Sequence, residues 1–153
     1  MPSYYADTSV LVKRHVPEVG SPWMRALFKP SAANTIITGQ LSLTELYSAI
    51  NRRVREQSIT PLRYQRIISV INFVWGAQYE VITLTDNLVN QTKFLLGRHP
   101  LRAYDAVQLA SALQARTAAL SVGVAAPIFL SADKQLLQAA QAEGFVTDDS
   151  NLH

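Results

Sequence analysis

The chain has 153 residues, and its 48% hydrophobic and 16% charged residues exclude an intrinsically disordered protein and indicate one domain with a real core. It has no cysteine, which excludes a disulfide framework and a thiolate metal site, and its formal net charge of +3 suits a nucleic-acid or acidic protein partner without demanding one. No basic leader precedes an apolar run and no window could span a bilayer, so we expect a cytoplasmic protein with no membrane partner.

The N-terminal stretch predicts a short strand that stops at a carboxylate. Tyr4 to Ala6 form the strand, the polar trio Asp7-Thr8-Ser9 ends it, and Val10 to Val16 predict a helix. Asp7 therefore lies at a strand exit, where open α/β sheets bind their ligands. The same position suits a helix N-cap, because Asp accepts hydrogen bonds from the free amides of a first turn. Both roles, cation ligand and cap, stay open.

The next segments predict a strand and an amphipathic helix. The β-branched run from Asn34 to Thr38 reads as a strand that Gly39 ends. From Leu41 to Glu56, apolar side chains recur at helical spacing. Glu45 lies at the margin of that apolar stripe. It is either a solvated neighbour of the core or a site residue.

A second helix follows and forms a hairpin with the first. Thr60 suits its cap and Pro61 its first position, and a clear apolar stripe runs over residues 64–75. Gly76 predicts the end of this helix. We expect the hairpin to cover one side of a sheet.

The third predicted strand covers residues 79–84, and a helix capped by Thr85 or Asp86 follows it. A further helix over residues 102–119 is small or apolar on most faces, which indicates a helix enclosed by its neighbours. Asp105 is the odd residue on it. An ionised carboxylate there is costly unless it caps an end, pairs with a cation or faces a cleft.

The C-terminal part repeats the N-terminal pattern. Pro127 to Leu130 are continuously apolar, as in a strand buried on both faces, and Asp133 follows at its exit. Lys134 to Glu143 predict a helix that Gly144 closes. Residues 145–147 predict a last short strand, and residues 148–153 a loose tail.

Strands that alternate with helices predict a mainly parallel α/β sheet with helices on both faces, and its strand exits then share one edge. Asp7 and Asp133 lie at two such exits, and Glu45 and Asp105 converge with them if their helices project toward the same edge. Close carboxylates raise each other's pKa, and a divalent cation relieves that repulsion. All-oxygen ligation favours Mg²⁺ or Mn²⁺, and such a site suits metal-assisted phosphodiester hydrolysis.

Four ordered segments carry a family resemblance. They are Asp7-Thr8-Ser9, Leu43-Thr44-Glu45-Leu46, residues 102–110 (RAYDAVQLA) and Phe129-Leu130-Ser131-Ala132-Asp133. Together they resemble the acidic signatures of the PIN-domain ribonucleases, and most of all the VapC-like toxins of type II toxin–antitoxin pairs. The resemblance covers nearly the whole chain in the right order.

The resemblance implies a single PIN-like domain over residues 1–153, with a three-layer α/β/α fold. It implies a Mg²⁺-dependent endoribonuclease in which Asp7, Glu45, Asp105 and Asp133 hold metal and position water, with Ser9 and Ser131 as supporting partners. It also implies homodimerisation and a small antitoxin as partner. The family often shows a further acidic or polar residue after its fourth motif, for which Gln135 and Asp148 are the candidates, so one or two metals stay possible.

Basic residues gather near the end of the Leu41–Glu56 helix. Arg52, Arg53 and Arg55 are candidate contacts to RNA phosphates, or else a partner surface or a solvated helix face. Two other functions stay open. One is a PIN-like binding module without catalysis, and the other is a Mg²⁺-binding phosphoacceptor signalling domain, although Lys134 directly follows Asp133 and only one acid, Asp7, lies near the first strand.

Overall fold

The computed structural model describes all 153 residues, which alternate between strands and helices. The five strands are β1 (Ser3–Ala6), β2 (Thr35–Gly39), β3 (Tyr79–Ile82), β4 (Ile128–Ser131) and β5 (Thr147–Asp149). The helices are α1 (Thr8–His15), α2 (Ser21–Leu27), α3 (Leu41–Arg55), α4 (Pro61–Gln78), α5 (Asp86–Arg98), α6 (Ala103–Ser121) and α7 (Lys134–Ala142), with short 3₁₀ helices η1 (Pro30–Ala32) and η2 (Ser150–Leu152).

The strands form one parallel sheet in the order β3-β2-β1-β4-β5. The first strand is central, because Tyr5 pairs with Ile37 of β2 on one side and with Phe129 of β4 on the other. Because all the pairs are parallel, the carboxyl ends of all the strands lie at the same edge of the sheet. The segments that follow β1 and β4 therefore meet there, as the strand exits predicted.

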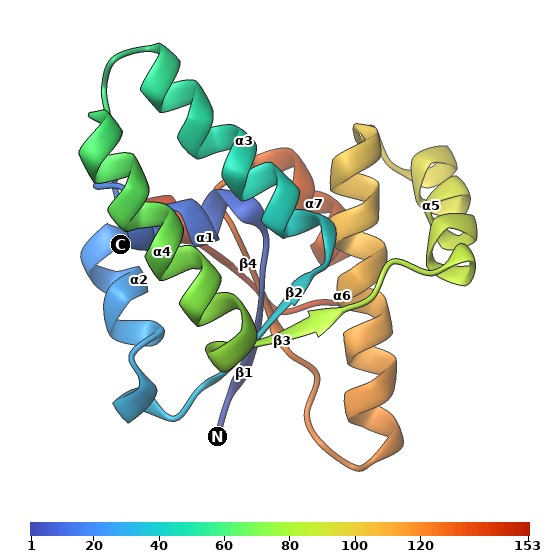
Figure 1. Cartoon of the computed structure of the whole chain (residues 1–153). Helices are drawn as coiled ribbons and strands as arrows, with labels where there is room; N and C mark the ends of the chain where they lie inside the picture. The colour runs from blue at the N-terminus through green and yellow to red at the C-terminus, as the bar shows by residue number, and fades with distance from the viewer.

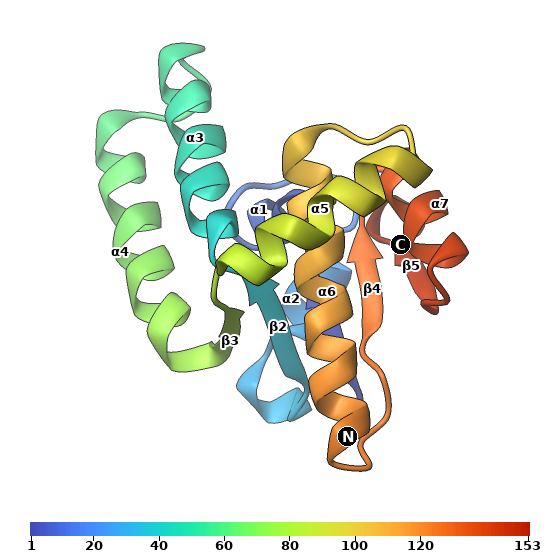
Figure 2. The same cartoon turned by 90° about the vertical axis from the view of Figure 1, so that its right-hand side faces the viewer.

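Helices cover both faces of the sheet, so the predicted three-layer α/β/α architecture is confirmed. Helices α1 to α4 lie on one face and α5 to α7 on the other, with α5 outside α6 (Figures 1 and 2). Alternate strand residues supply the two cores. Ala6, Ile36 and Leu130 face the first, whereas Tyr5 and Phe129 face the second.

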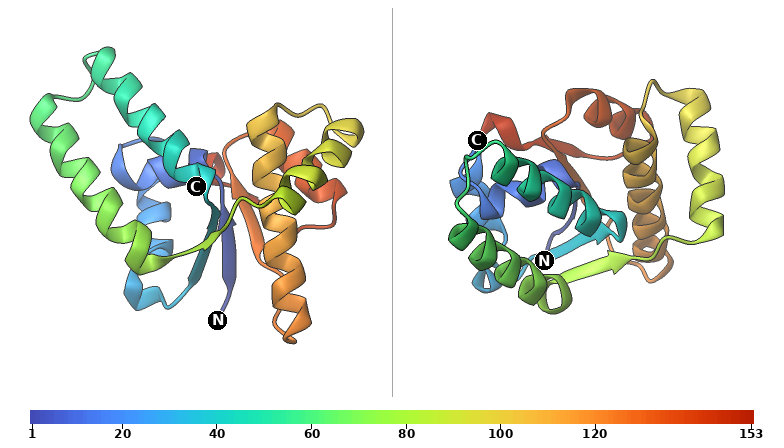
Figure 3. Two further views of the ribbon diagram at one scale, coloured as in Figure 1. Left: turned by 45° about the vertical axis from the view of Figure 1, so that its right-hand side comes forward. Right: turned by 45° about the horizontal axis from the view of Figure 1, so that its top comes forward.

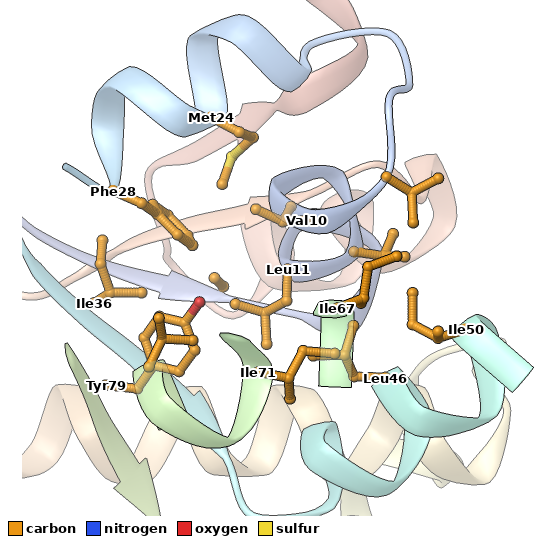
Figure 4. Close-up of a cluster of buried hydrophobic side chains, with 14 of the residues drawn as sticks. Val10, Leu11, Met24, Phe28, Ile36, Leu46, Ile50, Ile67, Ile71 and Tyr79 are labelled. Carbon is orange, nitrogen blue, oxygen red and sulfur yellow. The ribbon is translucent and has the colours of Figure 1, made fainter. Parts of the chain in front are cut away.

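The larger core lies beneath the α3–α4 hairpin. Leu11 of α1 packs among Leu46, Ile50, Ile67 and Ile71 from the two hairpin helices (Figure 4). The periodic apolar stripes of these helices predicted this packing, and their burial provides the hydrophobic free energy that holds the hairpin on the sheet. Thr60 caps α4 by accepting from the Arg63 amide at 3.2 Å, as its sequence position predicts.

Two predicted boundaries are wrong. Helix α4 does not end at Gly76 but continues to Gln78 and passes directly into β3. A Cβ at residue 76 would meet nothing within 4 Å, so this glycine lies on an open face of the helix. Neighbouring buried side chains such as Val74 and Tyr79 hold the segment, and their packing outweighs a glycine cost of about 1 kcal/mol.

The last strand is also shifted, to Thr147–Asp149 instead of residues 145–147. Phe145 instead fills the second core, where it packs against Phe129 with ring centroids 5.7 Å apart. An edge strand needs only backbone pairing on one side, so polar residues suffice for it.

The predicted loose tail is ordered. Asp149 caps η2, and the buried Lys13 ammonium donates to the Asn151 side-chain oxygen at 2.8 Å. The Asn151 amide donates in turn to the Ala132 carbonyl at 3.2 Å. The tail therefore joins α1 to the loop that carries Asp133. None of the helices combines the length and apolar character needed to cross a bilayer.

Candidate active site

All four predicted acids line one pocket of about 610 Å³ at the carboxyl edge of the sheet. Helices α3 and α6 stand on opposite sides of these strand ends (Figure 3). The pocket lining consists of Asp7, Thr8, Ser9, Val12, Thr44, Glu45, Ser48, Ala49, Arg52, Arg102, Tyr104, Asp105, Gln108 and Asp133. Residues far apart in sequence thus supply one polar, strongly acidic cavity, as the strand-exit argument predicted.

Asp7 is the most buried of the four acids, with 5% of its surface exposed. It follows β1 and caps α1, where its Oδ1 accepts from the Val10 amide at 3.2 Å. The predicted cap role of Asp7 is therefore confirmed, and the same side chain lines the pocket, where its role as a cation ligand stays a prediction. Burial raises the pKa of Asp7 from 3.8 to about 6, although hydrogen bonds from Ser9, Ser131 and Val10 oppose the rise.

The two predicted supporting serines both lie against Asp7. Ser9 Oγ donates to Oδ1 at 2.6 Å, and Ser131 Oγ donates to Oδ2 at 2.7 Å. Each serine oxygen also accepts from the β4–α7 loop, Ser9 from the Ala132 amide at 2.9 Å and Ser131 from the Asp133 amide at 3.0 Å. The serines therefore tie the two strand exits together and leave little freedom to the Asp7 carboxylate.

Glu45 projects from the first turns of α3 and is partly buried. Its Oε1 accepts a hydrogen bond from the Gln108 amide nitrogen at 3.1 Å. Burial is the main cause that raises the pKa of Glu45; hydrogen bonds from Gln108 and Thr8 lower it, and the nearby Asp105 charge raises it. Glu45 is therefore not a solvated helix residue but a half-buried acid directed at the cavity.

Asp105 lies in the first turn of α6, whose N-cap is Arg102, so Asp105 is not the cap. Burial first, and then the negative charge of Asp133, raise its pKa, and Arg102 lowers it. The Arg102 Nε lies 3.7 Å from Asp105 Oδ2, but the arginine side chain is 87% exposed. An exposed pair of this kind contributes little stability. The charge of Asp105 is thus largely available to the pocket.

Asp133 follows β4 and caps α7. Its Oδ1 accepts from the amides of Gln135 at 2.8 Å and Leu136 at 3.1 Å. Asp7 and Asp133 therefore have the same construction, a carboxylate that ends a parallel strand and begins the next helix. The two candidates for a further acidic position, Gln135 and Asp148, do not line this pocket, and Asp148 instead lines a separate one between α7 and β5.

The three candidate RNA-contacting arginines separate in space. Arg52 lines the acidic pocket. Arg53 turns away and pairs with Glu18, and Arg55 is exposed at the last residue of α3. Only Arg52 is therefore positioned to contact a molecule that also reaches the four acids.

The chemical type of the metal-binding atoms in the pocket suits a hard divalent cation such as Mg²⁺. Four carboxylates provide oxygen ligands, and no sulfur or imidazole lines the cavity. No three acidic, histidine or cysteine side chains lie close enough together to hold an ion among themselves. Mg²⁺, however, is usually bound by one or two carboxylates plus waters and substrate phosphate, so a ready-made cage is not required.

Gln108 is the site residue that the sequence did not single out. It is 3% exposed and contacts Tyr5, Thr8, Ser42 and Glu45 through its amide. A helical glutamine is ordinarily a surface residue. Its one local signal is the spacing of three from Asp105, which places both side chains on the same face of α6.

The sequence matches the family model of the PIN domain over residues 4–142. No curated protein matches it. Among solved structures, VapC20 of Mycobacterium tuberculosis, a toxin that cleaves the sarcin–ricin loop, superposes with a TM-score of 0.62 at 19% identity, over 94% of this chain and 96% of that one.

Two further solved structures have the same architecture. The VapBC2 structure from Rickettsia felis, bound to a promoter DNA fragment, gives a TM-score of 0.59 at 12% identity, over 96% of this chain and 98% of that one. The FitAcB structure from Neisseria gonorrhoeae gives 0.62 at 10% identity, over 96% and 97%. At these identities the superpositions establish the shared fold.

Proposed function

This chain belongs to the PIN domain family, and on that premise we propose that it is a metal-dependent endoribonuclease, the toxin of a toxin–antitoxin pair. The single observation that carries the proposal is the convergence of Asp7, Glu45, Asp105 and Asp133 on one pocket. Two of these acids come from strand exits and two from helices on opposite sides of the sheet edge. Burial opposes the charged forms there, since it raises the pKa of Asp7, Glu45 and Asp105, and a bound cation would offset that cost.

The four acids would supply the protein ligands for Mg²⁺, with waters and substrate phosphate completing its coordination, and Mn²⁺ is a similar ion that prefers oxygen ligands. When bound, the ion supplies Lewis-acid chemistry, namely activation of a water nucleophile and stabilisation of the negative charge on a phosphodiester. The chain's own contribution is orientation. Ser9 and Ser131 hold both oxygens of Asp7, and the α7 amides hold Asp133, so these carboxylates are directed before any substrate arrives.

RNA is the substrate class that we propose, and a phosphate next to the scissile bond would lie against Arg52 at the pocket wall. VapC20, which superposes on the chain, is a toxin that cleaves the sarcin–ricin loop, and this favours a target with loop structure. The VapBC2 neighbour is a toxin–antitoxin structure, which supports a small antitoxin protein as partner. A homodimer and a cytoplasmic location complete the proposal.

The test is RNA cleavage by the purified chain. We expect cleavage of structured RNA with Mg²⁺ or Mn²⁺ and none with EDTA. Asp105→Asn should lower the cleavage rate by more than about 100-fold, beyond the effect typical of residues that only support a metal ligand. The matched control is Asp86→Asn, which makes the same change in the first turn of α5, at an exposed residue outside the pocket.

Three results would contradict the proposal. Cleavage that persists in EDTA would exclude the metal, and full activity of Asp105→Asn would exclude the pocket. A folded wild-type chain that binds RNA or an antitoxin but cleaves nothing would instead support the binding module without catalysis.

A further inference from the structure

The side-chain amide of Gln108 is buried at the wall of the pocket and contacts residues on the pocket side and on the core side. The Gln108 Nε2 group donates to Ser42 Oγ at 2.8 Å and to Glu45 Oε1 at 3.1 Å, with Thr8 Oγ1 at 3.4 Å. Its Oε1 accepts from the Tyr5 hydroxyl at 2.7 Å. The amide is therefore held at both ends, since its NH₂ group has acceptors for both hydrogens and its oxygen accepts one hydrogen bond.

The two ends of this amide are not interchangeable. A carboxylate only accepts hydrogen bonds, so the Glu45 oxygen requires the NH₂ end of Gln108. The opposite end then presents its carbonyl oxygen to Tyr5, which must donate. Tyr5 is completely buried, and its phenol hydroxyl donates this hydrogen bond to the amide oxygen. Tyr5 and Glu45 together therefore set the orientation of the amide.

The surrounding residues provide room for this contact. A Cβ on Gly39, the last residue of β2, would lie only 3.0 Å from the Tyr5 hydroxyl oxygen and 3.0 Å from Ser111 Oγ. Glycine at this position leaves space for the hydroxyl at the sheet edge. The Tyr5 ring itself stacks on Phe129, with centroids 5.5 Å apart, so both ends of the tyrosine are fixed.

We propose that Gln108 is a positioning residue that directs the Glu45 carboxylate toward a divalent cation in the pocket, and that Tyr5 acts through Gln108 by selecting which end of the amide meets Glu45. The inference rests on the proposed function, because it assigns a role toward the proposed metal. Residues that orient a metal ligand typically change metal affinity or activity by about 10- to 100-fold when they are removed. A carboxylate oxygen that accepts one hydrogen bond keeps further acceptor positions for a cation.

The experiment measures Mn²⁺ binding directly, by electron paramagnetic resonance of the free ion during titration with the full chain. Gln108→Leu should weaken Mn²⁺ binding by about 10- to 100-fold, and Tyr5→Phe by a smaller factor, since it removes only the orienting hydroxyl. The matched control is Gln114→Leu, the same change at an exposed position of α6. It should bind Mn²⁺ as the wild type does.

The double variant tests whether Tyr5 acts through Gln108. If it does, Tyr5→Phe combined with Gln108→Leu should bind Mn²⁺ no more weakly than Gln108→Leu alone, because the two changes interrupt the same contact. Additive losses would overturn this part of the inference. If Gln108→Leu does not fold, Tyr5→Phe carries the test by itself, and wild-type Mn²⁺ affinity in that variant would overturn the inference.

The outcomes separate this inference from the proposed function. A wild-type chain that binds no Mn²⁺ and cleaves no RNA overturns both. A wild-type chain that does both, with a folded Gln108→Leu variant that binds Mn²⁺ equally well, overturns only the positioning role. In that case Gln108 would serve packing alone, and its loss would lower thermal stability without changing metal affinity.

Discussion

The four acids of the pocket are held in two different ways. Asp7 and Asp133 each end a strand and cap the next helix, and each accepts hydrogen bonds from main-chain amides. Glu45 projects from helix α3 and accepts hydrogen bonds from the side chains of Gln108 and Thr8, and Asp105 projects from helix α6 beside the exposed Arg102 side chain. The two strand-exit acids therefore also stabilise the start of a helix, whereas the two helix-borne acids do not cap any helix.

This difference predicts which substitutions change the stability of the fold and which change only the charge of the pocket. Replacing a strand-exit acid changes both the helix that it caps and the charge of the pocket. Replacing a helix-borne acid changes the charge with little effect on the backbone. The comparison is therefore testable by the free energy of unfolding, measured without metal so that ligand binding does not contribute.

The largest effect is expected for Asp7→Asn. The folded-state pKa of Asp7, about 6, exceeds its ordinary value of 3.8, so the carboxyl stabilises the fold when protonated and this stability is lost as the pH rises through about 6. At pH 7 the asparagine variant should be more stable than the wild type by about 3 kcal/mol, since each pKa unit corresponds to about 1.4 kcal/mol. Asparagine still caps α1 through its side-chain oxygen.

Urea denaturation in EDTA near pH 4 and pH 7 measures this difference. The gain should nearly vanish near pH 4, where the wild-type carboxyl is protonated. Asp105→Asn is the comparison, with a smaller gain because Asp105 is only partly buried and lies beside Arg102. A loss of stability in Asp7→Asn at pH 7 would mean that the serine network outweighs the cost of burying the charge.

A smaller effect is expected for Asp133→Ala. Alanine removes the acceptor for the Gln135 and Leu136 amides, and the loss of such a cap costs about 1 kcal/mol. Asp133→Asn keeps an acceptor and should restore most of that stability, measured by urea denaturation. It should not restore RNA cleavage, because the negative charge is absent. If the Asp133→Ala variant were as stable as the wild type, Asp133 would not stabilise α7 as its cap.

The smallest effect concerns Arg52, which shares α3 with Glu45. In the uncleaving Asp105→Asn background, Arg52→Gln should reduce the slope of log affinity for RNA against log salt concentration by about one unit, as for the loss of one phosphate contact. Arg55→Gln, at the exposed end of the same helix, is the control and should change the slope less. Filter binding at several salt concentrations measures both, and equal changes would extend the RNA surface beyond the pocket.

The strand-exit acids were predictable from sequence because their signal is local. A short apolar run followed by Asp defines both Asp7 and Asp133, and a parallel sheet brings such exits to one edge. Glu45 and Asp105 needed the family resemblance as well, since the apolar stripe alone left Glu45 as either a solvated residue or a site residue. The structure places all four in one cavity.

The role of Gln108 was not predictable because its partners lie elsewhere in the chain. Its contacts to Tyr5, Ser42 and Glu45 join three elements that meet only in the folded protein. The shift of β5 has a similar cause. Phe145 has the character of a strand residue, but the space beside Phe129 in the second core receives it, and the polar residues 147–149 pair with β4 instead.

The position of β1 in the sheet has a consequence for how the protein is made. This strand is synthesised well before its neighbour β4, in which Leu130 pairs with Ala6, and helices α1 to α6 lie between them in the sequence. Contacts so distant in sequence must wait for the intervening chain and are slow to close. The cavity needs both strands, because Asp7 and Asp133 enter it from their ends. A nascent chain therefore carries no complete acidic pocket until β4 and Asp133 have been synthesised.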